Sequence, residues 1–289
     1  MTRFSLIVAT VNRTAELGRL LASIDAQSYK GFEVIVVDQN HDDRLFAVLH
    51  QYPNLRISHL RSPLGASRAR NIGLRAAACN IVVTPDDDWW YPPELLATVK
   101  QWFDSHPGYG GIFAGLRNEA GLPMLPKWPP DAGLCDKANV WDCTMTATAF
   151  LRRELVDAVG GFNEQLGPGP DTAFKACEDI DYCIRALETG ARIYYDPAYV
   201  VYHPDLSSSA RLQDKTYSYA QAYGYVLRIH HYPLSFFLKR ALRSLGGAIF
   251  SLFKADFDRC RLYLLRAAGQ LRGYFWGPRD MAHFGTAAD

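Results

Sequence analysis

Three consecutive carboxylates, Asp86-Asp87-Asp88, directly follow the apolar run Ile81-Val82-Val83. Adjacent carboxylates repel one another, and burying them is costly unless a cation or hydrogen-bond donors balance their charge. At the end of a strand, such a cluster suits a hard divalent cation and the phosphates that the cation bridges. The alternative is a solvated acidic turn, and the triplet alone does not decide between the two interpretations.

Apolar runs alternate with helical patterns over the first 84 residues. Strands are predicted at 4–9, 33–37, 55–60 and 80–84, and helices at 17–24, 42–51 and 65–78. This β-α-β-α-β-α-β order predicts an α/β fold, with a mostly parallel sheet covered by helices.

Polar side chains follow three of the predicted strands. Thr10-Val11-Asn12 follows the first strand, Asp38 the second and Asp86–Asp88 the fourth. Ligands bind beyond the carboxyl ends of the strands in such sheets, and these ends share one edge. Their convergence indicates a single binding site at that edge.

The chain after Trp89 is less regular but predicts a second half of the same body. We expect helices at 92–105, from Arg152 onward and at 176–189, a loop at 121–136, and strands at 144–151, 192–195 and 200–202. The predicted body is thus residues 1–205, with halves at 1–105 and 106–205, followed by a separate region at 206–289. The serine-rich segment 205–211 is predicted to be a loop that closes over the ligand.

The region from Leu206 onward is basic and helical. It carries 12 Lys+Arg against 5 Asp+Glu, whereas the remainder carries 19 against 25. Helical periodicity over 217–231 and 234–271, with aromatic and basic residues interleaved, is typical of helices that lie in a membrane interface. We therefore expect peripheral membrane contact through 217–276. The alternatives are a helical appendage with solvated basic residues, or nucleic-acid binding, for which no motif is present.

Composition limits the remaining choices. The 289 residues are 48% hydrophobic, enough for a large core, and the net charge is only +1. Six scattered cysteines form no CxxC pair, which fits a reducing compartment. The start of the chain does not resemble a signal peptide, and no stretch has the roughly 18 uncharged apolar residues of a membrane-spanning helix. We expect a cytoplasmic protein, peripheral on the inner face of the membrane.

These motifs together resemble family 2 glycosyltransferases, which have the GT-A fold and use nucleotide-sugar donors. The resemblance covers roughly residues 4–205. It rests on the following segments: Phe4–Arg13, Val36–Asn40, Gly65–Gly73, Asp86–Asp88, Gly160–Glu164, Ala176–Cys183 and Gly190–Ile193.

The resemblance implies a donor-nucleotide site built from several segments. Its predicted residues are Thr10, Asn12, Arg13, Asp38, Arg70, Asn71, Asp86 and Asp87. Asp38 would hydrogen-bond the nucleobase and Asp86 would reach the ribose. Arg70, preferred over Arg68, would approach the phosphates or position the acidic loop, tasks that suit a guanidinium. Thr10–Asn12 could instead be only a helix N-terminal turn, and Asp38 a loop residue.

The same resemblance implies a divalent metal, Mn²⁺ or Mg²⁺, at the acidic triplet. Asp88 would bind it, but aligning the chain on Trp90-Tyr91-Pro92 transfers that role to Asp87. His203, in Tyr202-His203-Pro204, would complete the metal shell, since imidazole suits Mn²⁺. Alternatively, His203 is a hydrogen-bonded surface residue.

Glu178-Asp179 is similar to the family's Glu-Asp motif, which makes these two residues the predicted catalytic carboxylates. Asp179 would act as the general base on the acceptor hydroxyl. The structural alternative is that acidic residues favour a first helical turn through the helix dipole. Cys177 departs from the family pattern, in which a small glycine often precedes the motif.

The predicted activity is inverting transfer of a sugar from a UDP, TDP or GDP donor to a hydroxyl of a saccharide or lipid-linked saccharide. Such a reaction belongs to polysaccharide biosynthesis. The chain lacks a QxxRW-type motif, which favours single addition over processive synthesis. A sugar-1-phosphate nucleotidyltransferase would need a glycine-rich loop after the first strand, and Thr10–Thr14 contains no glycine. The non-enzymatic alternative is a carbohydrate- or membrane-binding module on a degenerate GT-A scaffold.

Overall fold

The computed structural model describes residues 2–124, 128–204 and 209–277. Its central feature is an eight-stranded sheet in the order β3-β2-β1-β4-β7-β5-β8-β6. The strands, in chain order, are β1 (Phe4–Thr10), β2 (Phe32–Asp38), β3 (Ile57–Arg61), β4 (Ile81–Val83), β5 (Gly111–Arg117), β6 (Gly133–Leu134), β7 (Ala149–Arg152) and β8 (Ile193–Tyr202).

The sheet is parallel from β3 to β4 and mixed beyond β4. Strand β7 runs antiparallel to both β4 and β5, β5 and β8 are parallel, and β6 is antiparallel to β8. The expectation of an α/β fold with a sheet flanked by helices is therefore confirmed, and the parallel character belongs mainly to its first half.

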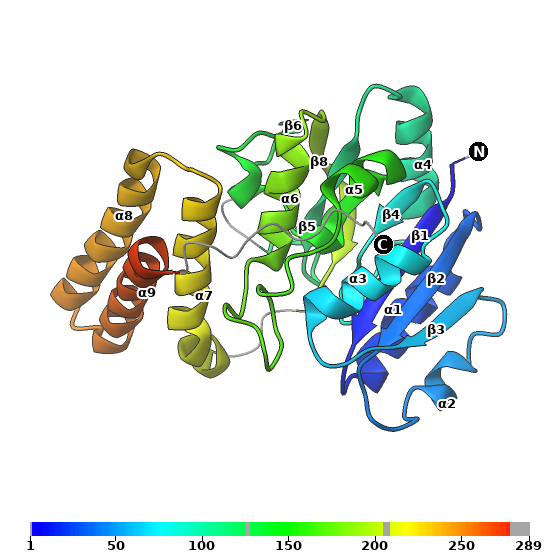
Figure 1. Cartoon of the computed structure of the whole chain (residues 1–289), viewed down its shortest axis with the longest axis horizontal. Helices are drawn as coiled ribbons and strands as arrows, with labels where there is room; N and C mark the ends of the chain where they lie inside the picture. The colour runs from blue at the N-terminus through cyan, green and yellow to red at the C-terminus, as the bar shows by residue number, and fades with distance from the viewer. Residues whose placement is uncertain (1, 125–127, 205–208, 278–289) are drawn as a thin grey trace, which may run out of the picture.

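Helices cover both faces of this sheet, and three further helices form a separate C-terminal group (Figure 1). They are α1 (Thr14–Asp25), α2 (Phe46–Leu49), α3 (Ala66–Ala76), α4 (Leu95–Ser105), α5 (Arg153–Val159), α6 (Glu178–Glu188), α7 (Ser209–Ile229), α8 (Leu234–Phe253) and α9 (Phe257–Trp276).

The alternation of side chains along β1 explains why the sheet separates two cores. Phe4, Leu6 and Val8 enter the core formed with α1 and α4, whereas Ile7 enters the core formed with α3, α5 and α6. A strand buried on both faces needs apolar residues at nearly every position, which is why the first strands appear as continuous apolar runs.

Strand β5 was not predicted, because glycines replace the usual β-branched residues. A Cβ at Gly111 would lie 2.8 Å from the carbonyl oxygen of Phe150, and one at Gly115 would lie 2.9 Å from Cα of Pro197. Neighbouring strands approach too closely here for any side chain. The predicted strand at 144–151 is also corrected: residues Thr146–Thr148 form a 3₁₀ turn, so β7 begins only at Ala149.

The predicted helix at 234–271 is two helices, α8 and α9. The chain turns at Ala255, whose φ is +55°, and the Asp256 side chain caps α9 by accepting from the N–H of Arg259 at 3.0 Å. Of the loop predicted at 205–211, residues 205–208 lie outside the described part of the chain, and α7 begins at Ser209.

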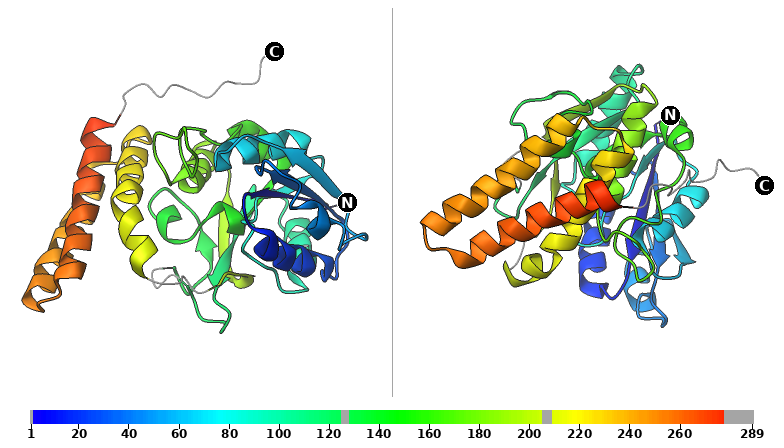
Figure 2. Two further views of the ribbon diagram at one scale, coloured as in Figure 1. Left: turned by 90° about the horizontal axis from the view of Figure 1, so that it is seen from below. Right: turned by 60° about the vertical axis from the view of Figure 1, so that its left-hand side comes forward.

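Glycines set how closely α9 approaches α7. A Cβ at Gly273 would overlap the carbonyl oxygen of Gln221, and one at Gly224 would overlap that of Gln270. Only backbones without side chains can pack so closely. Helix α8 packs in turn on α9, so the two form a hairpin beside α7 (Figure 2).

Across the described residues, none of the helices combines the length and apolar character needed to cross a bilayer.

We predict that Gly273→Ala disrupts the α7–α9 contact and destabilises the protein by about 2 kcal/mol or more, because the new methyl group overlaps backbone. Gly246→Ala on α8 is the matched control, since nothing lies near its added Cβ. For Gly246→Ala we expect no loss of stability, and a gain of up to about 1 kcal/mol in the free energy of unfolding from higher helix propensity. Urea unfolding followed by circular dichroism measures both. Equal effects of the two variants would contradict the proposed packing.

Candidate active site

Arg70 joins the two acidic motifs of the chain. It lies on α3 with its side chain 8% exposed; its Nη2 is 2.7 Å from Oδ1 of Asp86, and its Nη1 is 3.0 Å from Oε1 of Glu178. Burial alone lowers the pKa of Arg70, but the charges of Asp86 and Glu178 outweigh it and raise the pKa above its usual value. The loop after β4 and the first turn of α6 are thereby held against one guanidinium.

Asp179 lies beside this cation, in the first turn of α6. Its Oδ1 accepts a hydrogen bond from the N–H of Ile180 at 2.8 Å. Burial and the neighbouring charge of Glu178 raise the pKa of Asp179 to about 7, although Arg70 opposes the shift. A carboxylate with a pKa near neutrality is suited to accept a proton at physiological pH.

Cys177 precedes this motif in an unusual backbone conformation. Its φ is +67°, in the left-handed region that glycine adopts without strain. A side chain in this region costs on the order of 1 kcal/mol. The conformation explains why a glycine suits this position, and it turns the chain sharply into α6.

A second arginine holds the other two carboxylates of the triplet. Nη1 of Arg13 is 2.7 Å from Oδ1 of Asp87 and 2.6 Å from Oδ2 of Asp88. Burial raises the pKa of Asp87 to about 6, against the opposing effects of the Thr10 hydroxyl and Arg13. The triplet is therefore a partly buried cluster balanced by two arginines, rather than a solvated turn.

His203, just after β8, faces the same cluster. Its Nε2 is 3.8 Å from Oδ1 of Asp88, and its ring packs edge-on against Trp89. A carboxylate oxygen and an imidazole nitrogen suit Mn²⁺, and the carboxylates of the triplet suit Mg²⁺. Within the described residues, no three His, Cys, Asp or Glu side chains converge on one point as a complete metal site. The Asp88 carboxylate and the His203 imidazole are therefore the protein groups here whose chemistry suits a divalent cation.

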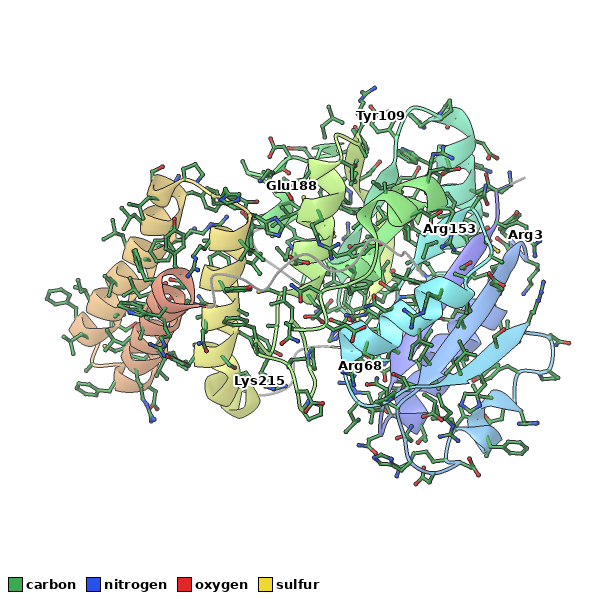
Figure 3. The ribbon with its side chains drawn as sticks, viewed as in Figure 1. Arg3, Arg68, Tyr109, Arg153, Glu188 and Lys215 are labelled. Atoms are coloured by element: carbon green, nitrogen blue, oxygen red, sulfur yellow. The ribbon has the colours of Figure 1, made fainter. Side chains whose placement is uncertain are left out.

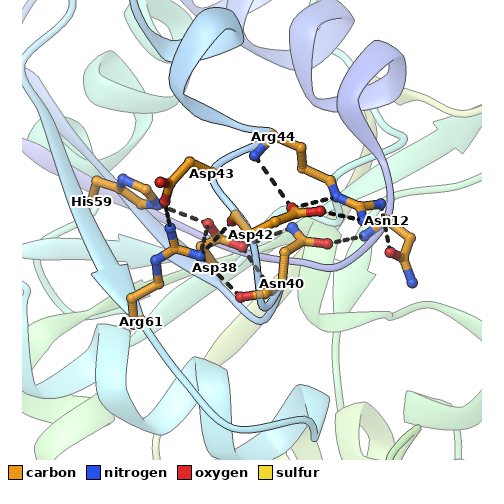
Figure 4. A network of polar contacts seen from close by, with 8 residues as sticks. All are labelled: Asn12, Asp38, Asn40, Asp42, Asp43, Arg44, His59 and Arg61. Atoms are coloured by element: carbon orange, nitrogen blue, oxygen red, sulfur yellow. Dashed lines mark hydrogen bonds and ion pairs between the residues drawn. The ribbon is translucent and has the colours of Figure 1, made fainter.

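Asp38 is fully buried, at the end of β2, and both of its oxygens are engaged (Figure 4). Oδ1 accepts from the backbone and side-chain nitrogens of Asn40 at 2.8 and 2.7 Å. Oδ2 is 3.0 Å from Nε2 of His59 and 3.0 Å from Nη1 of Arg61. Asp38 could contact a nucleobase directly only if one of these interactions broke and the base took the place of that partner.

The turn after β1 is fixed to this network. The N–H of Asn12, a residue with φ of +59°, donates to Oδ1 of Asn40 at 2.8 Å, and Oδ1 of Asn12 accepts from Nη1 of Arg44 at 2.8 Å. Arg44 also pairs with Asp42. Roles for Arg44, His59 and Arg61 were not predicted from the sequence. Asn40 stood in the segment Val36–Asn40 without a role, although Asp38-x-Asn40 has the spacing of a side-chain-stabilised turn.

The Asn71 side chain is hydrogen-bonded to the segment that follows α5. Its amide donates to the carbonyl oxygen of Phe162 at 3.0 Å and to Oε1 of Glu164 at 2.9 Å, and it accepts from the N–H of Phe162 at 2.6 Å. Arg68, labelled on α3 in Figure 3, also pairs with Glu164, at 3.2 Å. Both side chains therefore fix the segment after α5.

His230 connects the C-terminal helices to α6, the helix that begins at Glu178. This contact was not predicted from the sequence. The His230 side chain is 7% exposed. Its Nε2 is 3.0 Å from Oδ1 of Asp181, and its Nδ1 is 3.1 Å from Oε2 of Glu188, which Figure 3 labels on α6. Helix α6 is thus anchored on the side that packs against α7.

Comparisons with known proteins bear on the family and the fold of the chain. The family model "Glycosyl transferase family 2" matches residues 5–158. An uncharacterised glycosyltransferase of Haemophilus influenzae is 26% identical over 71% of this chain and 70% of its own length. The poly(ribitol-phosphate) beta-N-acetylglucosaminyltransferase TarS of Staphylococcus aureus is 31% identical over 60% of this chain, but the match spans only 32% of TarS.

Solved structures share the fold. TarS residues 1–349 in complex with UDP-GlcNAc superimpose with a TM-score of 0.61 and 20% identity, covering 84% of this chain and 67% of that one. The mannosyltransferase PcManGT of Pyrobaculum calidifontis, in complex with GDP-Man and Mn²⁺, gives a TM-score of 0.64 and 18% identity, covering 94% and 87%. At such identities the likeness establishes the GT-A fold.

We predict that Arg70→Met destabilises the protein by about 3–5 kcal/mol, because it leaves two partly buried carboxylates without their cation. Arg68→Met is the matched control: it lies on the same helix, its side chain is 40% exposed, and among the described residues it pairs with Glu164 alone. Loss of such an exposed pair should cost less than about 1 kcal/mol. Urea unfolding at pH 7 measures the difference, and equal losses would contradict the bridging role of Arg70.

Proposed function

Because this chain belongs to glycosyl transferase family 2, we propose that it transfers a single sugar, with inversion, from a nucleoside diphosphate to a hydroxyl of a saccharide or lipid-linked saccharide. The observation that carries the proposal is that Arg70 forms ion pairs with both Asp86 and Glu178. Arg70 holds the acidic triplet and the first turn of α6 together, so that a donor diphosphate and a general base can serve one reaction centre.

The donor binds at the carboxyl edge of the parallel strands, in the half formed by residues 1–105. UDP, TDP and GDP sugars are the candidates, and the complexes of TarS with UDP-GlcNAc and of PcManGT with GDP-Man support this class of donor. The end of β1 and the turn that follows it contribute Thr10, Asn12 and Arg13 to this donor site. Asp38 shapes this turn through Asn40, and it contacts the base only if it releases one of its present partners.

Asp88 and His203 are the proposed protein ligands of Mn²⁺ or Mg²⁺. Of the two alignments, the structure favours Asp88, because the Asp87 side chain is only 7% exposed whereas that of Asp88 is 20% exposed and faces the imidazole. A bound divalent cation neutralises the charge that develops on the departing diphosphate. Arg13 pairs with both Asp87 and Asp88 here, so a cation bound to Asp88 would replace one of these ion pairs.

Asp179 is the proposed general base. Its carboxylate accepts the proton of the acceptor hydroxyl while that oxygen bonds to the anomeric carbon and the bond from this carbon to the diphosphate oxygen breaks. Attack from the face opposite the leaving group inverts the configuration. Glu178 stays paired with Arg70 and acts as a positioning residue, and the half formed by residues 106–205 presents the acceptor.

A lipid-linked acceptor would place the enzyme at the inner face of the cytoplasmic membrane, in polysaccharide biosynthesis. The beta-monoglucosyldiacylglycerol synthase of Synechocystis, 29% identical over 62% of this chain and 39% of its own length, is a relative whose name describes a lipid product. The non-catalytic alternative gains no support, because both carboxylate motifs are present and connected by Arg70.

We predict that Asp179→Asn lowers the transfer rate about a thousandfold or more while leaving donor affinity within about twofold, because only the proton acceptor is removed. In the wild type, the base must be deprotonated, so the rate should rise with pH through about 7 and then level off. Stopped assays of sugar transfer across pH 5–9 and donor calorimetry measure both quantities.

Asp157→Asn is the control for this variant, since Asp157 lies on α5 with its side chain 63% exposed. It should retain the wild-type rate. Substantial turnover by Asp179→Asn would exclude Asp179 as the base.

We predict that Asp88→Asn weakens Mn²⁺ binding in the presence of the nucleoside diphosphate at least tenfold, because it removes a charged ligand. Electron paramagnetic resonance of free Mn²⁺ measures this in parallel samples with UDP, TDP and GDP. Asp157→Asn, an exposed carboxylate on α5, should have no effect. A larger effect of Asp87→Asn would transfer the metal role to Asp87.

A further inference from the structure

Helix α8 has the reverse of the usual amphipathic arrangement. The residues it buries are mostly small: Phe237, Ala241, Ser244, Ala248 and Ser251. Most of its large apolar residues are exposed, and six of them share one arc that we call the α8 outer face: Leu238 (43% exposed), Leu242 (63%), Leu245 (38%), Ile249 (58%), Leu252 (57%) and Phe253 (86%). Phe250, 61% exposed, lies beside this arc with Lys254 over its ring. Packing within the chain therefore does not account for the large side chains of α8.

The α8 outer face is a continuous stripe with cationic residues along one side. Successive residues of an α-helix lie about 100° apart, so members of this face, spaced by three or four positions, stay within an arc of about 100°. Lys239, Arg243 and Lys254 lie on the next arc, opposite the side on which the buried small residues lie. The helix thus presents one face to α9, one apolar face outward and one cationic face.

Packing contacts connect this helix to the body of the protein. The glycine contacts fix α9 against α7, and α8 packs on α9. Near its start, Nη2 of Arg240 is 3.4 Å from Oδ2 of Asp142 on the catalytic body. Phe257, the first residue of α9, is also exposed, at 69%. Figure 2 shows the α8–α9 hairpin as the outermost layer of the molecule.

Charge identifies the partner that fits this surface. From Leu234 to Trp276 the chain carries 8 Lys+Arg and 2 Asp+Glu, and α8 itself contains no acidic residue. A symmetric contact between the α8 faces of two copies would bring the same positive charges together, and these would repel. A bilayer with anionic headgroups offers both an apolar layer for the leucines and negative charge for the flanking lysine and arginines.

We propose that the α8 outer face docks the protein on an anionic lipid bilayer, with α8 lying in the plane of the interface. Leu242, Ile249 and Phe253 enter the boundary between headgroups and acyl chains, and Lys239, Arg243 and Lys254 extend to the headgroups. The proposal does not depend on the transfer reaction, because it needs neither donor nor acceptor.

Sedimentation with vesicles tests this proposal on the full chain. We expect binding to phosphatidylcholine vesicles that contain about one third phosphatidylglycerol, and weaker binding to phosphatidylcholine alone. Leu242→Gln/Ile249→Gln should lower the partition coefficient about tenfold or more, because two large side chains no longer enter the apolar layer. Arg243→Gln/Lys254→Gln should lower binding to the anionic vesicles several-fold and reduce its salt dependence.

Phe46→Gln is the matched control, since Phe46 is 60% exposed but lies on α2, away from the hairpin. It should bind vesicles as the wild type does. Circular dichroism establishes that each variant is folded. The proposal is overturned if the wild type does not bind anionic vesicles, or if Leu242→Gln/Ile249→Gln binds them equally well. It is also overturned if analytical ultracentrifugation finds a dimer for the wild type and a monomer for Leu242→Gln/Ile249→Gln, while vesicle binding is unchanged. In that case the α8 outer face joins two copies of the chain.

Discussion

The active-site arrangement depends on one buried cation. Arg70 is the group that holds Asp86, at the end of β4, and Glu178, at the start of α6, within hydrogen-bonding distance of a common partner. These residues are 92 positions apart in the chain, and without the guanidinium their charges would force the two motifs apart. The same cation limits how far the pKa of Asp179 rises, so that the carboxylate can still lose its proton near neutral pH.

The sequence predicted the elements whose physical pattern is local. Continuous apolar runs identified β1, β2 and β4, because a strand buried on both faces has no room for polar side chains. Strand β5 escaped detection for the opposite reason. Its position is set by how closely Phe150 and Pro197 approach Gly111 and Gly115, and this is a tertiary constraint that leaves no apolar pattern in the sequence.

The candidate site also combines residues that a local motif reveals with residues that only the packing of distant segments brings together. The resemblance brought Asp86, Asp88 and Asp179 to attention, and the structure places them around two arginines. It did not reveal that Asp38 is buried among Asn40, His59 and Arg61, nor that His230 bonds Asp181 from the C-terminal helices. Such partners lie up to 49 positions apart, and each depends on packing that a single sequence does not display. The site roles therefore stay predictions that rest on chemistry and geometry together.

In the proposed site, the acidic triplet and a divalent cation together bind a nucleoside diphosphate at the edge of the sheet. The decisive experiment is calorimetric titration of UDP, TDP and GDP into the wild-type protein, each with and without Mn²⁺. We expect one diphosphate to bind tightly, and only when the metal is present. If none of the three binds the folded protein in the presence of Mn²⁺, the proposed site is wrong.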